Sequence, residues 1–335
     1  MTMTKTVQIA VAGEALIDLI ARPDGAFEPC LGGAVYNLCR ALSLQGLGTL
    51  YLNPFSKDRF GQALRQQMLD NGVQLSHPHP IAAPTSLAVV ALDPSGHPDY
   101  AFYREGVADR QIKVAQLNQA CDTDSAPDLR WVGTGGLALD PQDADLYLPW
   151  LQTQRQAGRL IAVDANLRPS VMPDLVAYRR HVLTLLNEAH LIKVSDEDLQ
   201  HLQIPGADPL AQARQLLNQT TAQLLALTLG PDGAVLLSRS GACWFAQERQ
   251  ALKVVDTVGA GDSFFAGLLT ALTLTGFDGQ QPLTEENGER ALRHAVASAS
   301  LCVQERGCVP PSYQASHAWA TQHPATTRFE NAGKS

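Results

Sequence analysis

The sequence predicts an α/β protein with a mostly parallel central sheet, helices on both faces of that sheet, and a small β appendage. Short apolar strand patterns alternate with amphipathic helix patterns along most of the 335 residues. Two early extended segments, 16–28 and 87–107, interrupt that alternation. The length fits about two domains, or one large α/β domain with an appendage, and it suffices for a large core without disulfide bonds.

The first elements follow the βα rhythm. Residues 7–11 are apolar and rich in β-branched side chains, so they predict a buried strand. Leucine and alanine recur at helical spacing over 37–47, where Asn37 is the expected N-cap, and Gly72 closes a helix over 61–71. Further strands are predicted at 49–52 and 131–133.

A hairpin breaks this rhythm. The extended runs 87–93 and 99–104 are separated by a Pro-Ser-Gly-His-Pro turn at 94–98. We place this hairpin, with the extended segment 16–28, in a small β appendage outside the main sheet.

The second half returns to alternation, which predicts parallel strands joined by helices. Residues 160–164 (LIAVD) are a typical buried strand. The other strands are predicted at 189–194 and 223–229, with a second hairpin at 234–238 and 242–245. Helices are predicted at 143–157, 176–188, 208–218, 262–275 and 289–303.

Composition excludes several classes of protein. The chain has 25 Lys and Arg against 33 Asp and Glu, a net charge of −8, which argues against nucleic acid as the main partner. It has no apolar run of membrane-spanning length, and residues 1–6 do not resemble a secretory signal. The six cysteines form no CxxC pair, so we expect free thiols in a reducing, cytoplasmic compartment.

The most informative segment is 255–269, VDTVGAGDSFFAGLL. We predict a short strand that ends at Asp256, followed by the Gly-Ala-Gly of 259–261 at the start of a helix. Small residues let backbone N–H groups approach an anion, and a helix N-terminus adds positive potential. An acidic residue there would repel a phosphate unless it has another role. Asp262 is placed to act as a general base that takes the proton of a hydroxyl group.

Three simpler interpretations compete for this loop. It could be a structural turn with Asp262 as a helix cap. A dinucleotide-binding loop would need GxGxxG near the first strand and an acidic residue about 20 residues later, and this segment reads GAGDSF near the end of the chain. A Walker A loop would need GxxxxGK followed by Ser or Thr, which the segment lacks.

DTVGAGDSFFAGLL resembles the C-terminal signature of the ribokinase-like (PfkB-type) carbohydrate kinases. Residues 32–37, GGAVYN, followed by a helix, resemble the N-terminal signature of the same family, about 220 residues earlier and in the family's order. The resemblance extends from Gly13 to about Ser312. It implies a ribokinase-like fold in which the small β-sheet is a lid.

On this resemblance the chain divides into three parts. A large α/β nucleotide-binding domain takes residues 1–14, 36–84 and 110–312. A discontinuous β lid takes 15–35 and 85–109. Residues 313–335 are poor in large aliphatic side chains, so we expect a loosely held tail.

The resemblance also implies an ATP-dependent sugar kinase and assigns its residues. Asp262 would be the general base, and the backbone amides of Gly259, Ala260 and Gly261 would form an anion hole for the transferring phosphoryl group. The implied sugar contacts are Asp18, Gly32, Gly33, Asn37, Arg104 and Arg168.

Other positions would serve the nucleotide and ions. The implied nucleotide-binding residues are Ser195, Thr228, Gly230, Gly233 and Val296. Asp198 and Glu197 stand where the family carries a motif for water-bound Mg²⁺, although the motif is degenerate here and Glu197 could equally be an exposed acidic residue at a helix start. Asp256 and Val258 are implied for a monovalent cation such as K⁺.

Fructose is the expected acceptor, because GEALID at 13–18 and the Asp-Ala-Asn-Leu-Arg-Pro run at 164–169 are most similar to fructokinases. A 2-keto-3-deoxygluconate kinase is the nearest alternative, and a ribokinase or nucleoside kinase is another. A non-catalytic sugar-binding relative would be free to lose Asp262, which is present. In relatives such lids often pair between subunits, so a homodimer through the lid is expected.

Overall fold

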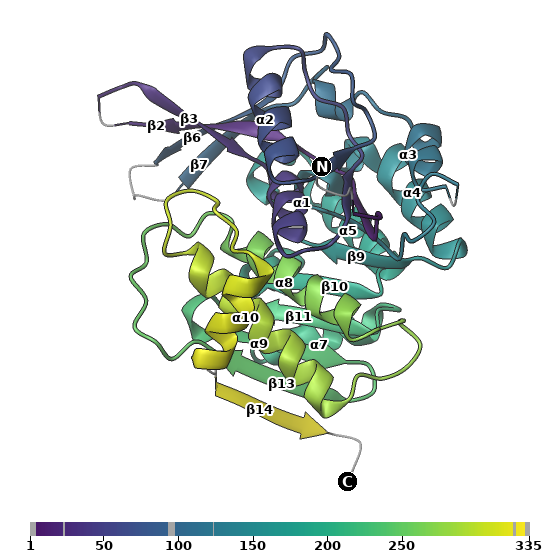
Figure 1. Cartoon of the computed structure of the whole chain (residues 1–335), viewed down its shortest axis with the longest axis vertical. Helices are drawn as coiled ribbons and strands as arrows, with labels where there is room; N and C mark the ends of the chain where they lie inside the picture. Colours follow the sequence, from purple (N-terminus) through teal and green to yellow (C-terminus); the bar gives the residue numbers. More distant parts are fainter. Residues whose placement is uncertain (1–4, 23, 93–97, 123, 324–325, 332–335) are drawn as a thin grey trace.

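The computed structural model describes residues 5–22, 24–92, 98–122, 124–323 and 326–331. Within these residues a ten-stranded sheet forms the centre of the molecule and a four-stranded sheet stands at one end (Figure 1). In spatial order the large sheet contains β14 (Thr326–Asn331), β13 (Ala242–Gln247), β12 (Ala234–Ser238), β11 (Leu224–Thr228), β10 (Leu191–Ser195), β9 (Leu160–Asp164), β8 (Trp131–Gly135), β1 (Ile9–Val11), β4 (Thr49–Tyr51) and β5 (Gln74–Leu75).

The large sheet is parallel from β5 to β11 and antiparallel from β11 to β14. Its α-helices are α1 (Ala34–Leu44), α2 (Arg59–Asp70), α3 (Val114–Ala120), α4 (Ala144–Gln156), α5 (Leu175–Glu188), α6 (Asp196–His201), α7 (Pro209–Gln219), α8 (Ala260–Leu274), α9 (Glu285–Cys302) and α10 (Tyr313–Gln322). Short 3₁₀ turns occur at Ala108–Arg110, Gly136–Leu139, Pro141–Asp143, Pro169–Val171 and Gly230–Asp232.

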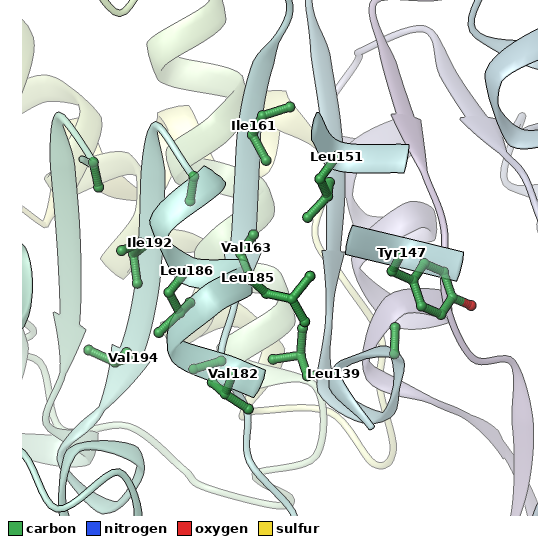
Figure 2. Close-up of a cluster of buried hydrophobic side chains, with 14 of the residues drawn as sticks. Leu139, Tyr147, Leu151, Ile161, Val163, Val182, Leu185, Leu186, Ile192 and Val194 are labelled. Atoms are coloured by element: carbon green, nitrogen blue, oxygen red, sulfur yellow. The ribbon is translucent and has the colours of Figure 1, made fainter. Parts of the chain in front are cut away.

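Strand alternation divides the core into two layers. Ile161 and Val163 of β9 face one layer, whereas Leu160 and Ala162 face the other, because successive side chains of a strand point to opposite faces. Figure 2 shows part of the first layer, where α5 covers β9 and β10. Helices α1, α2, α8 and α9 contribute to the second layer. Coverage of both faces explains why β9 and β10 are mostly apolar.

The small sheet has the order β3-β2-β6-β7, with bounds Phe27–Gly32, Leu16–Ala21, Ser86–Leu92 and Pro98–Tyr103. Strands β2 and β6 are parallel, and the two outer pairs are antiparallel. The predicted hairpin and the separate appendage are therefore confirmed. The predicted connection between the two strands of the hairpin falls mainly on 93–97, which lie outside the described residues.

Three predictions about local structure were wrong. Helix α1 begins at Ala34 with Gly33 as its N-cap, so Asn37 lies inside the helix and does not cap it. The strand predicted to end at Asp256 is absent, and the described segment 248–259 passes over the surface without strand pairing. Residues 313–331 are not a loose tail over their described part: α10 packs on α9, and β14 pairs with β13.

Candidate active site

The candidate site lies at the carboxyl ends of the parallel strands. Strand β9 ends at Asp164, β10 at Ser195 and β11 at Thr228, and the N-terminus of α8 lies close to this edge, since Gly261 adjoins the side chain of Lys193 from β10. Ligands of open α/β sheets bind at this edge because the loops that follow the strands converge there.

Asp262 is the buried acid of the site. It lies in the first turn of α8, is 8% exposed, and accepts a hydrogen bond of 3.1 Å at Oδ2 from Asn37 Nδ2. Burial, followed by the negative charge of Asp164, raises the pKa of Asp262 to about 7. A carboxylate with such a pKa holds a proton strongly enough to act as a general base near neutrality.

Asn37 joins the two sequence motifs of the chain. It comes from α1, 225 residues before Asp262, and α1 packs directly against α8. Its Oδ1 is buried and has no hydrogen-bond partner among the described residues. The failed helix-cap prediction thus has a physical reason: the amide is used across the interface between helices, with one acceptor still open.

The glycine loop at 259–261 needs its small residues. Gly259 has φ +78°, and a Cβ there would lie 2.2 Å from Cys308 Sγ. The amides of Gly259 and Gly261 have no acceptor among the described residues, as expected at a helix N-terminus. The Ala260 amide differs, since it donates to the carbonyl of Thr257 at 3.2 Å.

Asp18 and the glycine pair form the side of the site that belongs to the small sheet. A Cβ at Gly32 would lie 2.2 Å from Asp18 Oδ2, so a side chain there would displace that carboxylate from its present position. Gly33 has φ +108° and starts α1. Burial raises the pKa of Asp18 to about 6, and the nearby Arg168 opposes this rise.

The two arginines differ in their surroundings. Arg104 is buried between Asp140 and Asp143, at 3.3 and 3.5 Å, and it borders a cavity of about 550 Å³ between the small sheet and the 3₁₀ turns that follow β8. Arg168 is half-buried and donates to the carbonyls of Asn166 and Leu167. Among the described residues no carboxylate lies within ion-pair distance of Arg168, so its charge remains available to an anion.

Two buried charged residues escaped the sequence analysis. Lys193 of β10 donates to both oxygens of Asp164, at 2.8 and 2.9 Å. Glu14 accepts from the Ala34 amide at Oε1, its Oε2 is buried without a partner among the described residues, and burial raises its pKa to about 7. A lysine in the apolar strand pattern LIKVS and a glutamate directly after a predicted strand were the available signals.

The expected nucleotide positions are partly grouped. Ser195 and Thr228 are paired neighbours at the ends of β10 and β11. Gly230 and Gly233 frame the next turn, with φ +55° and +103°. Val296 is 7% exposed and packs in the second core layer, so it offers little surface to a ligand.

The expected metal positions are mostly engaged with backbone groups. Asp198 accepts from the Leu167 amide at one oxygen and from the Ser195 amide at the other, so it fixes the loop after β9. Glu197 is exposed. Asp256 accepts from the amides of Val258 and Gly307, which ties the glycine loop to the segment after α9. The described part of the chain contains no cluster of three or more His, Cys, Asp or Glu side chains that could hold a metal ion.

A buried carboxylate at a helix N-terminus, with open backbone amides beside it, is an arrangement that suits the transfer of a phosphoryl group to a hydroxyl group. The family model "pfkB family carbohydrate kinase" matches residues 7–315. The chain belongs to this family and is a carbohydrate kinase.

Known proteins agree with this assignment. A fructokinase of Rhizobium leguminosarum bv. trifolii is 32% identical over 270 residues, which covers 79% of this chain and 80% of the relative. The crystal structure of a fructokinase from Xylella fastidiosa with bound ATP has a TM-score of 0.80 at 26% identity and covers 95% of this chain and 99% of the other. A Vibrio cholerae O395 fructokinase double mutant, bound to fructose, ADP and potassium ion, shares the fold with a TM-score of 0.77 at 23% identity, covering 94% and 98%.

Proposed function

We propose that this carbohydrate kinase transfers the γ-phosphoryl group of ATP to a hydroxyl group of fructose. Asp262 removes the hydroxyl proton, the sugar oxygen attacks the γ-phosphorus, and ADP leaves with the electron pair of the broken P–O bond. The observation that carries the proposal is the buried, Asn37-bonded carboxylate of Asp262 at the N-terminus of α8. The fructokinase relatives support the choice of acceptor.

The anion hole is proposed at the amides of Gly259 and Gly261, which lack an acceptor among the described residues. The Ala260 amide joins them on substrate binding by releasing the Thr257 carbonyl, its present partner at 3.2 Å. Preorganised donors at this place offset the charge on the equatorial oxygens of the phosphoryl group.

The sugar is proposed to lie between the two sheets. Asp18 accepts from sugar hydroxyls, Gly32 and Gly33 permit close approach of the ring, and the open Oδ1 of Asn37 accepts another hydroxyl. Arg104 and Arg168 complete the expected contacts, with Arg104 oriented by Asp140. The adenine and ribose of ATP then lie near Thr228, Gly230 and Gly233, whereas the burial of Val296 makes it a packing residue behind them.

Mg²⁺ is proposed to accompany ATP. Both oxygens of Asp198 are occupied by amides, so Glu197 is the carboxylate of this motif that remains free to reach a water of the ion. Mg²⁺ fits such a site because it keeps several waters and uses few protein ligands besides phosphate oxygens. A K⁺ site is proposed at the backbone carbonyls of Asp256 and Val258, because the Asp256 side chain accepts from the amides of Val258 and Gly307 and so holds this loop in place.

The small sheet is proposed to be a lid that closes over the sugar and excludes water, because water would otherwise accept the phosphoryl group. A homodimer through this lid and a cytoplasmic location complete the proposal. All six cysteines are free, which suits a reducing compartment. None of the described helices is long and apolar enough to cross a membrane.

The test is a coupled assay of ADP release with ATP and Mg²⁺ and a panel of acceptors: fructose, ribose, 2-keto-3-deoxygluconate and a nucleoside. We expect the highest kcat/KM with fructose. Clear turnover of another acceptor together with none of fructose would contradict the choice of sugar. Absence of phosphorylated product with every acceptor would contradict the reaction.

2-Keto-3-deoxygluconate remains a second candidate on one observation. The Arg168 charge lowers the pKa of Asp18, and Arg168 has no carboxylate partner within ion-pair distance among the described residues, so it is free to bind a substrate carboxylate. Arg104 does not favour this acid, because Asp140 and Asp143 already offset its charge. The same panel separates the two acceptors.

A further inference from the structure

Lys193 carries an ammonium group inside the molecule. Lys193 of β10 points to the face of the sheet that α8 covers. Leu191, two residues earlier on the same strand, belongs to the core layer that contains α8, and side chains two residues apart share a face. The residue is 5% exposed. Burying an unpaired ammonium group is strongly unfavourable, so the partners of Lys193 require an explanation.

Asp164 is the partner, and it leaves one donor unused. The ammonium donates to Oδ1 at 2.8 Å and to Oδ2 at 2.9 Å, which accounts for two of its three N–H groups. No described residue accepts the third N–H. The pKa of Lys193 is raised by Asp164, despite the opposing effect of burial, so the amine stays charged.

Gly261 brings this charge next to the glycine loop. A Cβ at Gly261 would lie 3.3 Å from Lys193 Nζ and 3.5 Å from Cε. Gly261 does not have a positive φ, so the backbone conformation at this position does not require glycine. A side chain there would cover the ammonium on the side of the open amides.

We propose that Lys193 is a catalytic residue that donates its third N–H to an equatorial oxygen of the transferring γ-phosphoryl group. In that step Asp262 takes the proton of the sugar hydroxyl, the new bond joins the sugar oxygen to γ-phosphorus, and the bond to the ADP oxygen breaks. Lys193 keeps its proton throughout. Asp164 is the positioning residue that holds the ammonium, and the inference rests on the proposed phosphoryl-transfer site at Asp262.

A purely structural role for the pair is the competing explanation. A buried ion pair is often no more stabilising than apolar residues of similar volume. A purely structural pair would need no open donor beside the glycine loop, whereas Lys193 keeps one N–H without an acceptor among the described residues. Replacing a residue that contacts the phosphoryl group in the transition state lowers kcat, whereas replacing a residue that only stabilises the fold lowers the melting temperature.

The test is the double variant Lys193→Met/Asp164→Asn, because Lys193→Met alone would leave Asp164 charged and unpaired in the interior. We expect a melting temperature close to that of the wild type, kcat lowered by about 100-fold or more, and a sugar KM within about threefold. ADP, aluminium fluoride and sugar together mimic the transition state of phosphoryl transfer. We expect the affinity for this combination to fall by a similar factor.

The matched control is Arg155→Met/Glu188→Gln, which removes a part-buried ion pair of α4 and α5 outside the site and leaves kcat unchanged. A folded double variant at 193 and 164 with kcat within threefold of the wild type overturns the inference. Asp262→Asn separates a failure of the proposed site from a failure of the role of Lys193. If Asp262→Asn retains full kcat, the proposed site at Asp262 is contradicted. If it is inactive while the double variant is active, only the role of Lys193 fails.

Discussion

At the scale of single residues, Asp262 combines a buried position with the need to ionise. Burial and the charge of Asp164 hold its pKa at about 7, and only the ionised form accepts a proton. We therefore expect kcat/KM to fall about tenfold per pH unit below pH 7 and to level off above it. Steady-state kinetics between pH 5 and 9 measures this profile.

The matching substitution is Asp262→Asn, which keeps the size of the side chain and removes the base. We expect kcat to fall by about three orders of magnitude with sugar and nucleotide affinity retained. Isothermal titration with the sugar and with an ATP analogue gives the binding controls. Lost binding at an unchanged single-turnover rate would contradict the assigned role.

The same residue affects stability in a pH-dependent way. Because its pKa in the folded protein is above the usual carboxyl value of 3.8, the folded state binds the proton more tightly than the unfolded state. Ionisation of Asp262 therefore lowers the free energy of unfolding progressively from about pH 4 to pH 7, and the full loss is present above that range. Asp262→Asn removes this loss, so its melting temperature relative to the wild type should be higher at pH 8 than at pH 5. An equal difference at both pH values would show that burial does not penalise the charge.

At the scale of elements, the N-terminus of α8 depends on a glycine that is both in the left-handed region and crowded. We expect Gly259→Ala to lower kcat by about 10- to 100-fold, because φ +78° strains alanine and its Cβ would collide with Cys308. Gly276→Ala at the other end of α8 is the matched control: φ is +76°, but nothing lies within 4 Å. Both variants lose stability, and only the first should lose activity. Equal kcat values for the two would mean that the geometry of the loop is not needed.

The C-terminal elements complete the large domain. Ser316 of α10 is fully buried and bonds to Gln45 and Ser298, and β14 covers the edge of β13. We expect deletion of 313–335 to lower the melting temperature and to cause aggregation through the exposed strand edge. Deletion of 332–335 alone leaves β14 intact and is the control. Thermal denaturation and light scattering measure both effects.

Local sequence signals predicted these elements unevenly. Period and length identified β9 with its bounds and most helices within a few residues, because each has an apolar face of its own. The role of Asn37 and the attachment of α10 could not be predicted, since both depend on contacts with residues more than 200 positions away in the chain. Lys193 was missed because its pairing with Asp164, 29 positions earlier, depends on two strands being neighbours in the sheet.

At the scale of the whole molecule, a chain with a net charge of −8 is proposed to bind a polyanion. The positive potential is local: the open amides of Gly259 and Gly261, the N-terminus of α8, and the buried Lys193 lie at the same edge of the sheet. Charge on the remaining surface is then free to be acidic, because field from exposed groups is screened over about 10 Å at moderate salt.

The proposed dimer concerns the small sheet, which projects from the body of the molecule. Figure 1 shows β2 and β3 extending from the body, and their Ile20 and Phe27 are 39% and 49% exposed. Apolar side chains on a projecting sheet favour burial against a second copy. We expect the wild type to sediment as a dimer and Phe27→Asp to sediment as a monomer. Leu274→Asp, at an equally apolar position that is 62% exposed on α8, should remain dimeric.

Activity adds an independent readout of the same contact. If contact between two lids stabilises each of them, the monomeric Phe27→Asp variant should hydrolyse ATP faster in the absence of sugar. A less constrained lid excludes water from the site less well. The fold decrease in kcat with sugar should be smaller than the fold increase in the rate of ATP hydrolysis without sugar, since Asp262 and the glycine loop lie outside the small sheet. A wild type that sediments as a monomer at all concentrations would contradict the dimer, and the lid would then have to close on its own.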